Sequence, residues 1–239
     1  ENRSERRRFY QMKTMLKRWL LVMTAAVFLI AGSVTANAAP KNGWKTNTKT
    51  YSANITKDQR KAFRKATADK VGVSYKPIAV VGSQVVSGTN DAYLCLGKTM
   101  TKKAAADYYI VTIYTDLQNN PTLKHIEKIN LSSVRTTGSD EQTPGGWTIN
   151  QNLKKGKMPK AAKKAFSKAT KGHVGYTAKP IAYLGMKAKN GKDYKYLCLG
   201  KTVTADPKTT LDVVTVHVTP KGSAKIKSIK EFNLAAYTG

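Results

Sequence analysis

The sequence contains few of the side chains from which catalytic and metal sites are built. It has three histidines and two cysteines, and none of the histidines has a cysteine, histidine or carboxylate neighbour at metal-ligand spacing. Phosphate-binding glycine loops and carboxylate pairs that recur through the chain are also missing. Cys95 and Cys198 lie inside apolar segments, where a thiolate is not activated. We therefore predict that the protein is not an enzyme and uses no metal and no cofactor.

Acidic residues are scarce: 14 Asp and Glu stand against 42 Lys and Arg, for a net charge of +28. Residues 39–143 carry a net +8, and residues 144–239 a net +15. Such a surface favours anionic partners. Only three arginines follow residue 38, however, and lysine is a solvated point charge rather than a planar fork for phosphate. Because the chain also carries an export signal, described next, we expect no nucleic-acid partner; a solvated lysine-rich surface and an anionic-polymer site both remain open.

Long apolar runs are limited to residues 19–31, and this run is shorter than the ~20 residues of a membrane-spanning helix. Basic residues precede it and the small residues Ala36-Asn37-Ala38 follow it, as in a bacterial-type signal peptide. We predict a signal peptide over residues 1–38, of which residues 1–11 precede the true start at Met12. The mature protein is then expected to be secreted and extracellular, with membrane contact only through the signal peptide before cleavage.

The rest of the chain consists of two copies of one sequence unit. A constant offset of 103 residues relates the two copies without a gap, as five pairs illustrate: Trp44 and Trp147, Phe63 and Phe166, Pro77 and Pro180, Cys95 and Cys198, Leu131 and Leu234. Two copies of this length predict two small domains rather than a solenoid. We place domain 1 at residues 39–135, a polar linker at 136–144 and domain 2 at 145–239, and call the two units copy one and copy two.

The sequence of each copy predicts the same order of secondary-structure elements. A short segment after Gly-Trp can form an edge strand, and a helix follows, which in copy one begins with the capping box Thr56-Lys57-Asp58-Gln59. Four alternating segments then read as antiparallel strands. We therefore predict the α+β class, with one helix packed on a four- to five-stranded antiparallel sheet in each copy.

The cysteines fall at the same position of both copies, within Tyr-Leu-Cys-Leu-Gly. Export allows a disulfide between them. That bond would require equivalent strands of the two copies to lie face to face, so two buried free thiols are the favoured prediction.

The tip of the first predicted hairpin differs between the copies while its flanks do not. In copy one the tip is Gln84-Val85-Val86-Ser87-Gly88, between two strand-like runs. Copy two has Lys187-Ala188-Lys189 there. The fold therefore does not require the copy-one tip, which is free to serve a function.

This tip resembles the Gln-x-Val-x-Gly loop of the cystatins, and the element order of each copy is similar to the cystatin fold. The resemblance implies two tandem cystatin-like domains, the first of which inhibits papain-like cysteine peptidases by inserting this hairpin into the active-site cleft. In cystatins a glycine-containing N-terminal segment and a second hairpin, which often carries Pro-Trp, flank the first hairpin. Here the second hairpin lacks the tryptophan. The implied peptidase-binding residues are Gly43, Trp44, Gln84, Val85, Val86, Ser87, Gly88, Asn119 and Pro121.

A second hypothesis is a non-inhibitory extracellular binding module. Its lysine-rich surface in copy two would hold an anionic glycan, mucin or cell-wall polymer. The expected anion-binding residues are Lys160, Lys164, Lys168, Lys171, Lys187 and Lys189.

Overall fold

The computed structural model describes residues 43–47, 55–101, 105–136, 139–142, 146–149 and 158–239. For residues 139–142 it describes the backbone alone. The predicted signal peptide lies outside these ranges, so its cleavage and the secretion that it implies stay predictions. Within the described part of the chain, no helix is long and apolar enough to cross a membrane.

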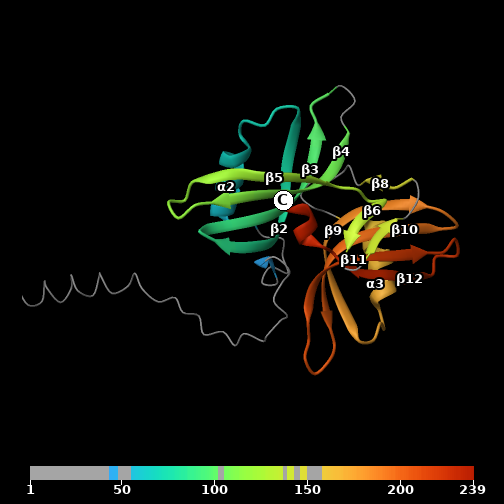
Figure 1. Cartoon of the computed structure of the whole chain (residues 1–239). Helices are drawn as coiled ribbons and strands as arrows, with labels where there is room; N and C mark the ends of the chain where they lie inside the picture. The colour runs from blue at the N-terminus through green and yellow to red at the C-terminus, as the bar shows by residue number, and fades with distance from the viewer. Residues whose placement is uncertain (1–42, 48–54, 102–104, 137–138, 143–145, 150–157) are drawn as a thin grey trace, which may run out of the picture. The chain divides into compact units, whose positions relative to one another are not determined.

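Each copy forms a five-stranded antiparallel meander (Figure 1). The first sheet has the order β1-β2-β3-β4-β5 and the second the order β12-β11-β10-β9-β8. The first consists of β1 (Lys45–Thr46), β2 (Val73–Val86), β3 (Gly88–Thr99), β4 (Ala106–Thr115) and β5 (Pro121–Ile129). The second consists of β8 (Thr148–Ile149), β9 (Tyr176–Ala188), β10 (Lys192–Thr202), β11 (Thr209–Val218) and β12 (Ala224–Glu231). The four long strands of each copy pair antiparallel in chain order, so the first and third reversals between them lie at one end of each sheet.

One helix of 11 residues precedes the long strands of each copy, α2 (Lys57–Thr67) and α3 (Lys160–Thr170). The predicted capping box at α2 is confirmed: the Gln59 amide donates to the Thr56 hydroxyl, and the Thr56 amide donates to the Gln59 side chain, both at 3.1 Å. Phe63 of α2 contacts Tyr93 of β3, with ring centroids 5.0 Å apart. A short 3-10 turn, η2 (Leu234–Tyr237), ends the chain.

The predicted α+β class is wrong. The described residues are mostly strand, and the architecture is not a pair of helix-on-sheet domains. The reason is visible on β3, where Tyr93 and Cys95 face the α2 side while Leu94 and Leu96 face a second core. Both faces of each sheet are buried, and the helix covers only one of them. The sequence signal was the unbroken apolar run Tyr-Leu-Cys-Leu, which is typical of a strand buried on both faces.

The second core is shared by the two copies. It joins one face of the first sheet to one face of the second, with β3 contributing Leu94 and β10 contributing Leu197 and Leu199. Residues 39–239 accordingly form one compact unit. The Tyr108 hydroxyl donates to the Tyr183 carbonyl across this core at 2.7 Å, so buried polar groups of one copy are satisfied by the other. The boundaries of the two expected domains remain a prediction, and the expected linker 136–144 contains strand β7 (Ser139–Gln142), which pairs with β6 (Ser133–Thr136).

The copies interlock through equivalent leucines and glycines. A Cβ at Gly82 would lie 2.5 Å from Leu234 Cδ2, and one at Gly185 would lie 2.9 Å from Leu131 Cδ1. Because 82 and 185 are equivalent positions, as are 131 and 234, each copy places its last leucine on the glycine of the other. Glycine is needed at both places for this close approach.

This contact predicts coupled stabilities. Gly82→Ala is expected to destabilise the chain by about 1–3 kcal/mol through overpacking. Leu234→Ala is expected to cost about 2–5 kcal/mol through the cavity that it leaves. The double variant should cost less than the sum, because shortening Leu234 removes the atom that the new methyl group would strike. Urea unfolding measures all three variants, and strictly additive costs would contradict the contact.

Candidate functional site

The first hairpin of copy one ends in a very tight turn. Val86 pairs with Gly88 across Ser87, and Val85 pairs with Thr89. The predicted hairpin is therefore confirmed, although its turn is shorter than expected, since residues 84–86 belong to β2 and Gly88 to β3. Val85 is 78% exposed and Val86 43% exposed. The tip thus offers apolar surface to a partner.

The first hairpin is locked to the second, which joins β4 to β5. Gly88 has φ +133°, and a Cβ there would lie 2.4 Å from the Thr115 carbonyl oxygen. The Tyr114 hydroxyl donates to the Ser87 carbonyl at 2.6 Å. A side chain at position 88 would therefore separate the two tips, so glycine is required for their side-by-side arrangement.

The N-terminal segment lies beside the same tip. Gly43 has φ +74°, and a Cβ there would lie 3.6 Å from Gln84 Nε2. Gln84 Oε1 accepts a hydrogen bond from Asn90 Nδ2 at 2.7 Å, which holds this side chain across the hairpin. Trp44 is only 6% exposed and packs in the shared core. Of the Gly43-Trp44 pair, only Gly43 lies at the surface.

The second hairpin tip is ordered by one carboxylate. Asp116 accepts hydrogen bonds from the amides of Gln118 and Asn120, at 2.9 and 2.7 Å. The hydrogen bond from the Asn120 amide is the largest cause of a lowered Asp116 pKa. Asn119 takes the left-handed conformation, with φ +63°, and Leu117 is 75% exposed. Pro121 begins β5 directly after the turn and is half-buried.

A groove of about 930 Å³ runs between the two tips and α2. Val85, Val86 and Leu117 give it apolar lining, and Asp58, Lys61 and Lys65 of α2 give it charged lining. We call Gly43, residues 84–88 and residues 117–121 the copy-one edge. The structure brings together every expected peptidase-binding residue at this edge except the buried Trp44.

The equivalent end of copy two has the same backbone and a different surface. Gly191 corresponds to Gly88, with φ +113° and a Cβ position 2.2 Å from the Val218 carbonyl oxygen. Lys189 is exposed and Lys187 half-buried near this tip. The other expected anion-binding residues, Lys160, Lys164, Lys168 and Lys171, are exposed along α3 or at its end. Lys168 Nζ donates to the Gly222 carbonyl in the hairpin between β11 and β12 at 3.3 Å, so α3 lies beside the same end of the sheet as the Lys187–Lys189 tip.

Copy two also holds a charge cluster around the buried Asp193, which sequence reasoning missed. The Asp193 carboxylate lies 2.6 Å from His217 Nδ1 and 2.8 Å from Lys227 Nζ. Burial alone would raise the pKa of Asp193, but the hydrogen bonds from Lys227 and His217 lower it below its usual value of 3.8. Copy one has Asn90 and Tyr114 at the positions of Asp193 and His217. The 103-residue offset could have revealed this paired change on neighbouring strands.

The cluster predicts acid-sensitive stability. Because the folded pKa of Asp193 is lowered, its contribution is fully present above the unfolded value of 3.8 and is lost as pH falls through the folded pKa. The difference in unfolding free energy between the wild type and Asp193→Asn should therefore shrink as pH is lowered toward about 2. Urea unfolding at several pH values measures it. A difference that stays constant with pH would contradict the pairing.

Both cysteines are free and buried, as predicted, and burial raises the pKa of each thiol. Among the described residues, no group of three or more His, Cys, Asp and Glu side chains could hold a metal ion.

No protein-family model matches this chain, and no curated protein matches it in sequence.

Proposed function

We propose that the copy-one edge inserts into the active-site cleft of a papain-like cysteine peptidase and inhibits it. The observation that carries the proposal is the gathering of Gly43, the Gln84–Gly88 tip and the second tip at one end of one sheet. These are the three segments that the cystatin resemblance of the loop implies. The proposal rests on the loop and its neighbours, and not on the α+β class.

The physical properties of the edge support a blocking role. A turn held by the Tyr114–Ser87 hydrogen bond loses little conformational entropy on docking. Val85 and Leu117 add exposed apolar area that a cleft can bury. A sharp reversal at Ser87 also does not offer the extended backbone that a peptidase cleaves. Since no tryptophan stands in the second tip, a frequent source of interface hot spots is missing, and we expect micromolar inhibition.

Val85→Asp tests this proposal without disturbing the fold, since Val85 is 78% exposed. A charge placed on the apolar tip is expected to raise the inhibition constant for papain by about tenfold or more, equivalent to ~1.4 kcal/mol. The matched control is Ala188→Asp, which makes the same change at the equivalent position of copy two and should leave inhibition unchanged. Steady-state inhibition of papain measures both.

Two outcomes would reject the proposed inhibition. One is the absence of inhibition by the wild type at tens of micromolar. The other is an equal loss in the two variants, which would indicate an effect of net charge.

Gly88→Ala and Gly191→Ala form a second matched pair, because both glycines have a positive φ and a backbone oxygen close to the position of the added Cβ. Only Gly88→Ala should weaken inhibition.

A lysine-rich surface on α3 supports a second candidate, binding of an anionic polymer. Lys160, Lys164 and Lys168 are exposed, and α3 contains no acidic residue. Their equivalents in α2 are Lys57, Lys61 and Lys65, beside Asp58. The two helices therefore present the same lysines in different electrostatic surroundings.

The two helices give a charge-matched test. Replacing the three α3 lysines with glutamate should lower the salt concentration at which the chain elutes from immobilised chondroitin sulfate. Replacing the three α2 lysines should lower it much less, although the change in net charge is the same. Equal shifts would mean that the chain behaves as any basic protein and would reject a specific site.

A further inference from the structure

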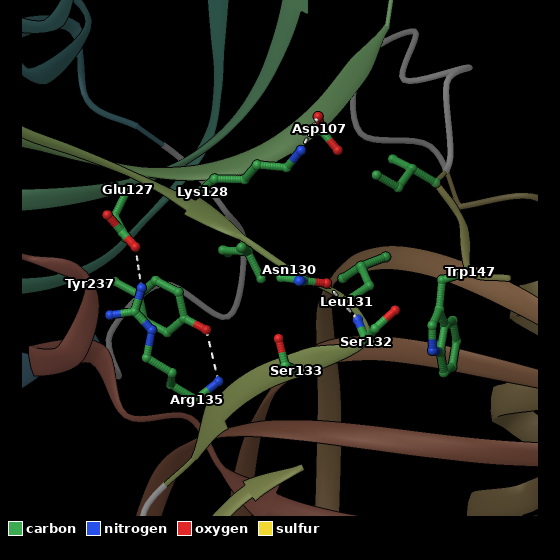
Figure 2. A pocket seen from close by; sticks show the side chains of 12 residues that line it. Asp107, Glu127, Lys128, Asn130, Leu131, Ser132, Ser133, Arg135, Trp147 and Tyr237 are labelled. Atoms are coloured by element: carbon green, nitrogen blue, oxygen red, sulfur yellow. Dashed lines mark hydrogen bonds and ion pairs between the residues drawn. The ribbon is translucent and has the colours of Figure 1, made fainter. Parts of the chain in front are cut away.

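A second cavity, away from the copy-one edge, lies where the two copies meet. It measures about 470 Å³ and is formed by the end of β5, the following turn, the start of β6, β8 and the residues that precede it, and the C-terminal turn η2. Figure 2 shows Trp147 at one end and Arg135 with Tyr237 at the other. Its volume falls within the roughly 300–1,000 Å³ of small-molecule sites.

The charged side chains of the cavity neutralise one another. Lys128 Nζ lies 2.6 Å from the Asp107 carboxylate, and Arg135 pairs with Glu127 (Figure 2). The Arg135 guanidinium also donates to the Ala236 carbonyl. With two anions and two cations paired at close range, the wall carries no net charge that would select a charged ligand.

Trp147 is the aromatic ring that the cavity can offer to a ligand. Lys195 Nζ lies 4.5 Å from the indole centroid and donates to the Leu131 carbonyl at 2.9 Å, which fixes one side of the ring. Tyr237 is less accessible, because Phe232 stacks on it at 4.8 Å and Arg135 lies over it at 4.4 Å. A ligand would therefore contact the part of Trp147 that lines the cavity.

Neutral hydrogen-bonding groups lie between the two ends. Asn130, Ser132 and Ser133 line the cavity (Figure 2). Asn130 Oδ1 accepts from the Ser132 amide at 3.0 Å, which orients the Asn130 amide group. Hydroxyls both donate and accept, and the amide nitrogen donates.

Copy two does not carry the two hydroxyls at the equivalent positions. At the positions of Ser132 and Ser133, copy two has Ala235 and Ala236. At the position of Trp147, copy one has Trp44, which is buried in the shared core. The hydroxyls and the half-buried indole are thus peculiar to this one cavity.

We propose that this cavity binds a neutral saccharide of one or two rings. A sugar ring has an apolar C–H face that packs on an indole, and its hydroxyls can both donate to and accept from serine and asparagine side chains. The paired charges of the wall suit a neutral sugar. The site is separate from the copy-one edge and does not depend on peptidase inhibition.

Isothermal titration calorimetry of the full chain with cellobiose, maltose and di-N-acetylchitobiose tests the proposal. Saturable binding of at least one disaccharide is expected, with a dissociation constant of about 1 mM or tighter. The double variant Ser132→Ala, Ser133→Ala should weaken binding about tenfold or more. Trp147→Ala should abolish detectable binding, while Val85→Asp, at the other site, should leave it unchanged.

Three results would overturn the proposal. They are no saturable binding of any of the three disaccharides, binding that survives the double serine variant unchanged, or preferential binding of glucuronic acid over the neutral sugars. If Trp147→Ala fails to unfold in a single cooperative transition, the double serine variant alone decides.

Discussion

The rest of the structure depends on the apolar core that the two copies share. Leu94 of the first sheet and Leu197 of the second belong to one buried cluster, and Leu131 and Leu234 close it from opposite copies. Burial of this face is the dominant favourable term for both sheets. The hairpin tips lie outside this core, so they can vary in sequence while the strands keep their register.

The duplication separates what the fold needs from what it permits. Gly88 and Gly191 both have a positive φ and both approach a backbone oxygen of a neighbouring strand closely, so both copies need them. The side chains around them differ: copy one exposes Val85, and copy two buries Asp193 beside His217. The two copies therefore present surfaces of different chemistry on similar backbones, which is the physical basis for proposing inhibition by copy one alone.

Much of this organisation was predictable from the sequence, because it depends on local signals. The capping box at Thr56, the hairpin at Ser87 and the two buried thiols each follow from short patterns. The fold class was missed: the run Tyr-Leu-Cys-Leu indicates burial on both faces, but what covers the second face lies about 100 residues away in the chain. Burial of Trp44 was missed for the same reason, whereas the Asp193 cluster could have been found from the paired change at positions 193 and 217 between the copies.

Hydrogen–deuterium exchange of the chain, with and without papain whose catalytic cysteine is replaced by alanine, tests the central claim most directly. Inhibition by the copy-one edge predicts slower exchange on papain binding at the amides of residues 84–88 and 117–120, with no change at residues 187–192. Protection at the copy-two tip, or no protection at either tip, would contradict the account.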